Sequence, residues 1–261
     1  MDAKKFKSPF RMHEDVVYLA EMEIGEQQQK QYLMIDTGSS LVWTQRYDYQ
    51  PKFRMVFGCA HQERIALTTV KDCTGILGLD RKTRFSYCAP PRMPSISRRD
   101  SWLHFGSHAQ ISGKKVPLVI RWGKYYLTLT AITYKYNILM SPVPVIAYKS
   151  RKDYLHTMVD TGPSLQTLPS SSHDDQLKEI DAIIKSENVV KAGTSSWPRH
   201  SYLGTMDNVK DITVTLSFEG AANRVDDSSK AILGMFAQTT INVEYDLLRG
   251  EIAMDPIRCA R

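Results

Sequence analysis

The sequence predicts a mainly β protein with two similar lobes and a few short helices. Two observations lead to this fold class. A motif in the first half of the 261 residues recurs in the second half. Most apolar residues also fall in short alternating runs bounded by Gly, Asn, Asp and Lys, as in half-buried strands. We therefore expect one lobe at residues 1–115 and a second lobe at residues 116–261.

The repeated motif surrounds an aspartate. The segment MIDTGSSLVWT at residues 34–44 aligns in register with MVDTGPSLQTL at residues 158–168, so its acid, Asp36, has an equivalent in Asp160. Ile-Leu-Gly follows each motif, in GILGLD and in AILGMF. The two acids are 124 positions apart (160 − 36), close to half the chain. This spacing indicates a duplicated lobe rather than the short period of a solenoid.

Four runs carry the strand pattern, and one segment has a helical pattern. The strands are expected in DVVYLAEMEI, KYYLTLTAITY, DITVTLSFEG and TTINVEYDL. Ser172 as an N-cap, Asp175 three positions later and apolar residues on one face of residues 174–187 predict a helix. The Pro-rich or basic tracts at residues 90–101 and 142–151 are interpreted as connections.

Each repeated acid follows an apolar run and precedes a turn. Burying a carboxylate requires hydrogen-bond donors, and the Thr-Gly that follows each acid offers hydroxyl and amide donors at a sharp turn. Two carboxylates presented by equivalent turns can meet between the lobes, where they cannot both ionise easily and share one proton. One can then activate a water while the other polarises a carbonyl, without a metal or a covalent nucleophile.

Beyond the two motifs, six blocks resemble the pepsin-like aspartic proteases of peptidase family A1, and more narrowly the plant group of nepenthesins and chloroplast-nucleoid-type proteases. These blocks are VVYLAEMEIGEQQQKQYLMIDTGSSLVWTQ, FGCAHQE, GILGLDRKTRFSYC, LHFGSHA, YYLTLTAIT and AILGMFAQTTINVEYDLLRGEIAMDPIRC. The resemblance implies a bilobal pepsin-like acid protease fold and an aspartic endopeptidase that acts on a peptide or protein substrate. It also implies a monomer without a cofactor, located outside the cell, in the vacuole or in the plastid.

The resemblance assigns roles to residues of both motifs. It makes Asp36 and Asp160 the catalytic pair, while the dyad is supported by Thr37, Gly38, Ser39, Thr161 and Gly162. The two threonines would brace the two turns against each other. The hydroxyl of Ser39 would bond the first aspartate.

Three departures from the family pattern point to weak turnover. The segment RYDYQPKFRMV at residues 46–56 stands where the family has a cysteine-rich insert and a substrate-covering flap, and Tyr47 and Tyr49 are interpreted as surface or packing residues. Pro163 replaces a hydroxyl residue, and the stretch at 197–232 is short. The alternative is therefore a catalytically weak or inactive pepsin-like protein acting as a peptide-binding or inhibitor module. A third possibility is the product of a truncated or mis-spliced gene.

The four cysteines allow three pairings, and none lies in a C-x-x-C pattern typical of zinc. The resemblance implies a disulfide between Cys88 and Cys259, with Cys59 free or paired with Cys73. Four reduced thiols are the open alternative, because the first residues, MDAKKFKSPF, contain no apolar signal segment.

Composition argues against several other functions. The net charge is +6, from 34 basic and 28 acidic residues, but the basic residues are scattered without a nucleic-acid-reading motif. No apolar run reaches the about 20 residues that span a bilayer. His104 and His108 are interpreted as structural, because Gly106 separates them in a strand-and-turn block. We therefore expect no metal, no nucleic acid and no membrane partner.

Overall fold

The computed structural model describes most of both predicted lobes, with gaps. The described residues are 6–13, 17–24, 28–45, 58–60, 72–80, 84–90, 101–109, 112–135, 145–149, 155–186, 190–192, 201–203, 213–220 and 231–256. Strands dominate these residues, as the sequence predicted.

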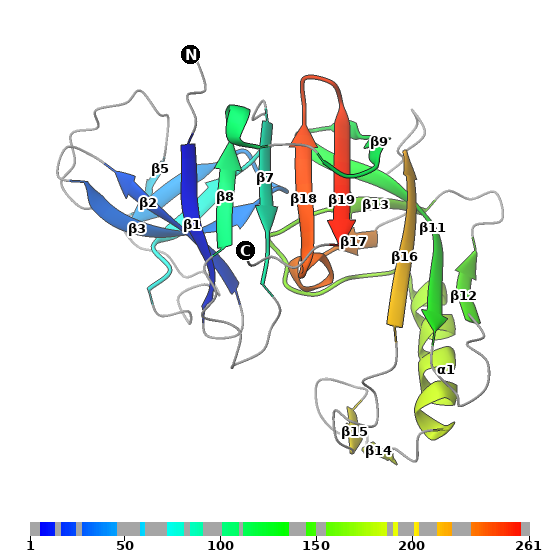
Figure 1. The fold of residues 1–261 in the computed structure, drawn as a ribbon. Coiled ribbons are helices and arrows are strands. Elements are labelled where there is room, and N and C mark those ends of the chain that lie inside the picture. The colour runs from blue at the N-terminus through cyan, green and yellow to red at the C-terminus, as the bar shows by residue number, and fades with distance from the viewer. Residues whose placement is uncertain are drawn as a thin grey trace.

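The largest sheet among the described residues has eleven strands and takes members from both ends of the chain (Figure 1). In spatial order they are β5 (Gly58–Ala60), β4 (Val42–Gln45), β6 (Gly75–Gly78), β3 (Gln29–Asp36), β2 (Val17–Ile24), β1 (Phe6–His13), β8 (Ser101–Phe105), β7 (Arg84–Cys88), β18 (Ile241–Asp246), β19 (Glu251–Pro256) and β9 (Lys115–Pro117). The pairing of β7 with β18 joins residues of the first half to the end of the chain.

The second sheet belongs to the second half of the chain. It contains β10 (Val119–Arg121), β11 (Lys124–Lys135), β13 (Leu155–Val159) and β17 (Ala231–Leu233), and β11 also pairs with β12 (Val145–Lys149) and β16 (Thr213–Gly220). A small third sheet pairs β14 (Val190–Ala192) with β15 (Ser201–Leu203). Among the described residues, the helices are α1 (Ser170–Ser186) and two short 3-10 helices, η2 (Gly106–His108) and η4 (Met235–Gln238).

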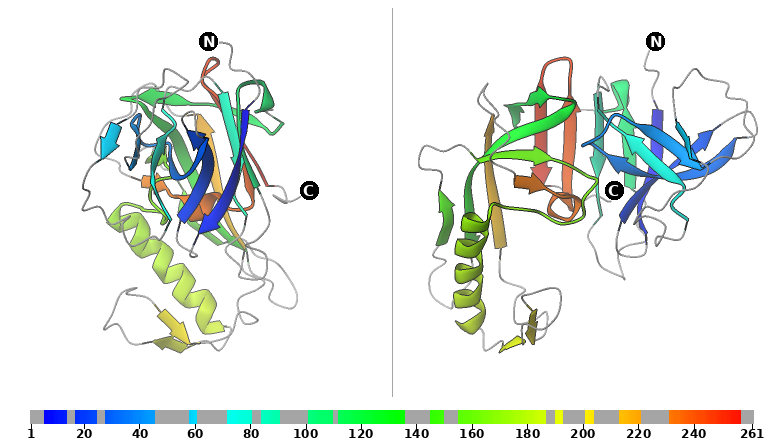
Figure 2. Two further views of the ribbon diagram at one scale, coloured as in Figure 1. Left: turned by 90° about the vertical axis from the view of Figure 1, so that its left-hand side faces the viewer. Right: turned by 180° about the vertical axis from the view of Figure 1, so that it is seen from behind.

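The two predicted lobes lie at opposite ends of the molecule. Strands β1, β2, β3 and β5 occupy one end, and β11, β12, β16 and α1 occupy the other (Figures 1 and 2). Strands β7, β18 and β19 lie between them. The bilobal, mainly β prediction is confirmed. The boundary at residues 115 and 116 stays a prediction, because the large sheet continues through both halves.

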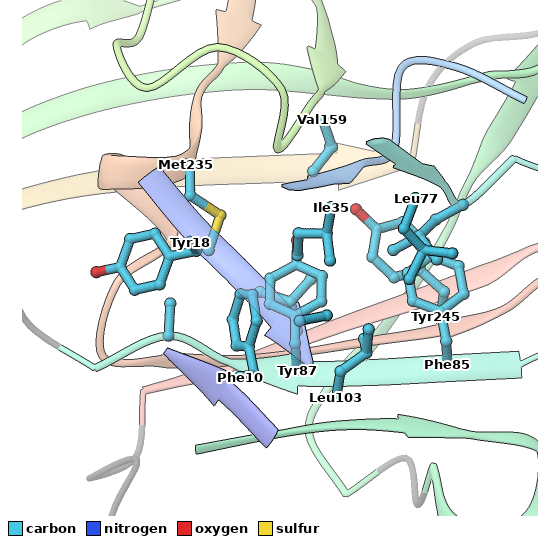
Figure 3. Packing of buried hydrophobic residues seen from close by; sticks show 14 of the residues in the cluster. Phe10, Tyr18, Ile35, Leu77, Phe85, Tyr87, Leu103, Val159, Met235 and Tyr245 are labelled. Carbon is cyan, nitrogen blue, oxygen red and sulfur yellow. The ribbon is translucent and has the colours of Figure 1, made fainter. Parts of the chain in front are cut away.

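One hydrophobic core runs through both halves. Tyr245 of β18 stacks on Phe85 of β7 with ring centroids 4.4 Å apart. Tyr125 of β11 packs against the ring of Tyr245, with centroids 5.0 Å apart. The residues that precede the two aspartates, Ile35 and Val159, are buried in this cluster (Figure 3). Their burial fixes the start of both turns, because burying an apolar side chain of this size stabilises the fold by about 2 kcal/mol.

An ion pair reinforces the junction of β7 and β18. Arg84 and Asp246 face each other in the strand register, and their side chains lie 2.5 Å apart with the carboxylate nearly fully buried. Burial alone would raise the pKa of Asp246, but the hydrogen bond and charge of Arg84 lower it. Arg84 thus offsets the free-energy cost of burying the charged carboxylate of Asp246.

Two local predictions are wrong. The helix begins at Ser170, so Ser172 lies inside it and is not its N-cap. The carbonyl of Pro169 accepts the first helical hydrogen bond, from the amide of His173 at 2.9 Å. The tract at 142–151 is also more than a connection, because it contains β12, whose Val145–Lys149 backbone pairs with the long strand β11.

The structure tests the predictions for two of the cysteines, Cys73 and Cys88. Cys88 is disulfide-bonded, which contradicts the alternative of four reduced thiols. Cys73 is a free, half-buried thiol, so it is not paired with Cys59. The predicted partner of Cys88, Cys259, lies outside the described residues. Within the described part of the chain, no helix is both long enough and apolar enough to cross a bilayer.

Candidate active site

The two aspartates follow equivalent strands. Asp36 ends β3 and pairs in parallel with Gly78 of β6, while Asp160 follows β13, whose last residue, Val159, pairs in parallel with Leu233 of β17. The amide of Asp160 donates to the carbonyl of Leu233 at 3.2 Å. Each acid is therefore positioned by the Ile-Leu-Gly strand of its own half, which explains why the two motifs recur together.

The glycine of each Ile-Leu-Gly lies against the loop that carries the acid. A Cβ atom on Gly78 would lie 2.6 Å from the carbonyl oxygen of Leu41, and one on Gly234 would lie 2.2 Å from that of Leu165. Leu41 and Leu165 each follow their aspartate by five positions. Neither glycine position can accept a larger residue, since the backbone of the loop occupies the space.

The two threonines brace the turns in a reciprocal arrangement. The amide of Thr37 donates to Oγ1 of Thr161, and the amide of Thr161 donates to Oγ1 of Thr37, both at 3.0 Å. Oγ1 of Thr37 donates in turn to the carbonyl of Val159 at 3.0 Å. Oγ1 of Thr161 donates to the carbonyl of Ile35 at 2.9 Å. Both side chains are buried, so these four bonds tie the halves together directly beneath the acids.

Each acid is also close to the glycine of the opposite turn. The amides of Gly38 and Gly162 donate to Oδ1 of Asp36 and of Asp160, respectively, both at 2.9 Å. A Cβ atom on Gly38 would lie 2.4 Å from Oδ2 of Asp160. One on Gly162 would lie 3.0 Å from Oδ1 of Asp36 and 3.2 Å from Oδ1 of Asp160. The two carboxylates therefore occupy one small space between the turns.

The environment of Asp160 favours its protonated form. Burial, followed by the charge of Asp36 and a side-chain hydrogen bond with it, raises the pKa of Asp160 to about 6. The amide of Gly162 and the positive charge of Lys124 oppose this rise. Two adjacent carboxylates of which one keeps its proton can serve as a general base and a general acid at the same time.

Comparisons with known proteins identify the fold. Residues 17–64 match the family model described as eukaryotic aspartyl protease. Basic 7S globulin from soybean has a TM-score of 0.68 at 11% identity, with 99% of this chain and 98% of that chain covered. Conglutin gamma, a basic 7S globulin from lupine seeds, has a TM-score of 0.63 at 12% identity over 97% of this chain and 95% of that chain.

The aspartic proteinase from Irpex lacteus has a TM-score of 0.57 at 12% identity, and 97% of this chain and 98% of that chain are covered. The chain has the pepsin-like acid protease fold. No curated protein sequence matches the chain.

One hydrogen bond predicted for the candidate site is not formed. The resemblance assigned to Ser39 a hydrogen bond with Asp36, but Oγ of Ser39 is buried without a hydrogen-bond partner among the described residues. Oδ1 of Asp36 accepts the amide of Gly38 instead. At the equivalent position of the second turn, Pro163 has no N–H, and its carbonyl accepts the amide of Met235 at 2.9 Å. Neither residue therefore donates to an acid.

A buried glutamine beneath the pepsin-like site was missed by the sequence analysis. Gln238 of η4 is fully buried, and its Nε2 donates to the carbonyl of Leu233 at 2.8 Å. The carbonyls of Asp160 and Gly234 lie 3.4 Å from the same atom. The hydroxyl of Tyr87 on β7 donates to its Oε1 at 2.5 Å. The signal in the sequence was a polar residue within the apolar run AILGMFAQ.

The remaining residues singled out from the sequence do not belong to this site or lie outside the described residues. Tyr47, Tyr49 and the rest of the segment that replaces the flap lie outside the described residues. His104 and His108 lie on β8 and η2 with ring centroids 6.3 Å apart. In the part of the chain that the structure describes, no three His, Cys, Asp or Glu residues are grouped as metal ligands would be.

Proposed function

We propose that the chain is an aspartic endopeptidase that hydrolyses peptide bonds of a peptide or protein substrate with Asp36 and Asp160. One observation carries the proposal. The two carboxylates share one space between equivalent turns, and burial together with Asp36 raises the pKa of Asp160 to about 6. Asp160 is therefore the acid that keeps the proton of the pair, and Asp36 is the base.

In the proposed reaction, ionised Asp36 accepts a proton from a water whose oxygen bonds to the carbonyl carbon of the substrate. Asp160 gives its proton to the carbonyl oxygen, which yields a neutral tetrahedral diol. Asp36 then protonates the leaving nitrogen, and one hydroxyl returns its proton to Asp160 as the C–N bond breaks. The products are a carboxylic acid and an amine, and both aspartates regain their starting protonation.

The second candidate is a weakly catalytic or inactive protein that binds peptides or inhibits another protein. It is favoured by the two residues that fail to support the acids, since Oγ of Ser39 has no partner among the described residues and Pro163 has no amide donor. Similarity of fold to basic 7S globulins and to an aspartic proteinase fits either candidate. Measured turnover distinguishes the two.

The test is digestion of an unfolded protein substrate from pH 3 to pH 8, with and without the transition-state analogue pepstatin. We expect cleavage that pepstatin abolishes and that declines as the pH rises through about 6, where the shared proton is lost. The double variant Asp36→Asn/Asp160→Asn, prepared in the same way, controls for contaminating proteases. A folded parent chain with no more cleavage than this variant would reject the peptidase and leave the binding protein.

A further inference from the structure

A lysine begins the strand that pairs with β13, the strand before the second aspartate. Lys124 is the first residue of β11, directly after a tight turn in which Trp122 and Gly123 both have positive φ, at 52° and 74°. In the antiparallel pairing of β11 with β13, Tyr126 faces Met158. Extending this register two residues, past the end of β13 at Val159, brings Lys124 level with Asp160 on the same side of the sheet.

The residues on either side of Lys124 are fixed to the first half of the chain. The hydroxyl of Tyr125, which is fully buried, donates to the carbonyl of Leu79 at 2.7 Å. Gly123 lies so close to Asp80 that a Cβ atom there would be 2.1 Å from its Oδ2. Leu79 and Asp80 follow β6 directly, and β6 is the strand that pairs with Asp36. The backbone of Lys124 is thus held between the segments that carry both acids.

The charge of Lys124 acts on Asp160, and Lys124 has no ion-pair partner within 4 Å in the described part of the chain. The ion pairs within 4 Å among the described residues do not include it. Its side chain is half-buried, where an ammonium acts more strongly than it does in open solvent. Its positive charge lowers the pKa of Asp160, against the larger effect of burial and the effect of Asp36.

We propose that Lys124 is the counter-charge of the Asp36–Asp160 pair, a positioning residue that favours the state in which the pair carries one negative charge over the state in which both acids are protonated. Charged or titratable groups near this site among the described residues include Tyr87 of β7, which interacts with the charge of Asp160, and Asp80, which lies beside Gly123. Tyr87 is neutral in the working range, because burial raises its pKa. Arg121 pairs with Lys124 in the register of β10 and β11, but it is exposed and its guanidinium lies over the ring of Trp122 at 4.2 Å. Lys124 is the cation whose charge acts on Asp160.

The role of Lys124 in turnover rests on the proposed function, but its effect on the acids is measurable without turnover. The probe is the pH titration of the carboxyl carbons in protein labelled with ¹³C at aspartate, with the pair assigned through Asp160→Asn. Removing the charge with Lys124→Met should raise both titration steps of the pair by about half a pH unit to one unit. Lys124→Gln is a second neutral variant in case the first does not fold.

Two matched variants separate a local charge from a general one. Lys124→Arg keeps the cation and should titrate within about 0.2 units of the parent. Lys178→Met removes one exposed lysine from α1, a helix at the outer end of the second lobe (Figure 1), and should change the titration equally little. If the chain is active, both limbs of its profile of kcat/KM against pH should move to higher pH in Lys124→Met, by the same number of pH units as the titration.

The outcomes distinguish this inference from the proposed function. An upward shift in an inactive chain supports Lys124 as the counter-charge and rejects the peptidase. An active chain in which neither folded neutral variant changes the titration keeps the peptidase and overturns the role of Lys124. An equal shift in Lys178→Met also overturns it, because the effect would then be that of net charge alone.

Discussion

The two aspartate turns have the same backbone arrangement but different surroundings. Both present an acid at the end of a strand, both donate a glycine amide to that acid, and both are braced by the same reciprocal threonine bonds. Asp36 is half-buried, whereas Asp160 is 8% exposed, and burial raises the pKa of Asp160 to about 6. A duplicated frame therefore holds two chemically identical groups in different surroundings.

This difference shows which features create the asymmetry of the site. The hydrogen-bond frame is nearly two-fold symmetric, so it cannot by itself give the two acids different pKa values. The raised pKa of Asp160 comes from its burial and from the neighbouring Asp36, while Lys124 acts in the opposite direction. If this interpretation is correct, changes to the frame should affect the two turns alike unless they also touch an acid.

The largest expected difference between the turns concerns their glycines. Gly38→Ala would place a methyl group 2.4 Å from Oδ2 of Asp160, whereas Gly162→Ala would place one 3.0 Å from Oδ1 of Asp36. The first contact forces a carboxylate to move, so we expect kcat/KM to fall by at least about 10²-fold. The second requires a shift of a few tenths of an ångström, and we expect a loss of about 10-fold. Steady-state kinetics on one peptide measures both. Equal losses would show that the two turns are equally crowded.

The threonine braces should be equal in energy. Thr37→Val keeps the shape of the side chain but removes the acceptor of the Thr161 amide and the donor to the carbonyl of Val159. Two buried backbone groups lose their partner, so we expect the free energy of unfolding to fall by about 2 to 4 kcal/mol. Thr161→Val should cost the same, because it leaves the equivalent groups unpaired. Urea unfolding of both variants tests this. A difference above about 1 kcal/mol would show that the frame is not two-fold in energy.

Much of this frame could be predicted from the sequence, and the reasons are physical. The repeat of Asp-Thr-Gly with a following Ile-Leu-Gly predicted two equivalent lobes, and the structure brings Asp36 and Asp160 together with both threonines and both glycines. Their catalytic role stays a prediction. The roles of Lys124 and Gln238 could not be predicted, because they depend on how β11 and η4 lie relative to Asp160, which is 36 positions from Lys124 (160 − 124) and 78 positions from Gln238 (238 − 160). The partner of Ser39 was predicted wrongly, because the resemblance cannot show which donor the first turn uses.

The pH dependence of stability should distinguish Asp160 from an ordinary surface acid. Its pKa is raised from 3.8 to about 6, so its contribution to stability is present below pH 3.8 and is lost as the pH rises through 6. This loss is on the order of 2 to 3 kcal/mol. Asp160→Asn should therefore gain stability relative to the parent between pH 4 and pH 7. Asp175→Asn on the exposed surface of α1 is the control. Urea unfolding at several pH values measures the slope, and parallel curves for parent and Asp160→Asn would contradict the raised pKa.

The smallest expected effect is at Ser39, where the two turns differ in sequence. Its hydroxyl has no hydrogen-bond partner among the described residues, so Ser39→Ala removes a group that contributes little to the folded state. We expect a change in the free energy of unfolding within about 0.5 kcal/mol and a kcat/KM within about 3-fold of the parent. The converse change, Pro163→Ser, should also have little effect, because the second turn uses the carbonyl of residue 163 rather than a side chain. Urea unfolding and peptide cleavage at pH 4 measure both variants.

A loss above about 10-fold in Ser39→Ala alone would mean that this hydroxyl does bond Asp36 when substrate is bound. The first turn would then supply a donor that the second turn lacks, and the asymmetry of the site would begin in the frame itself.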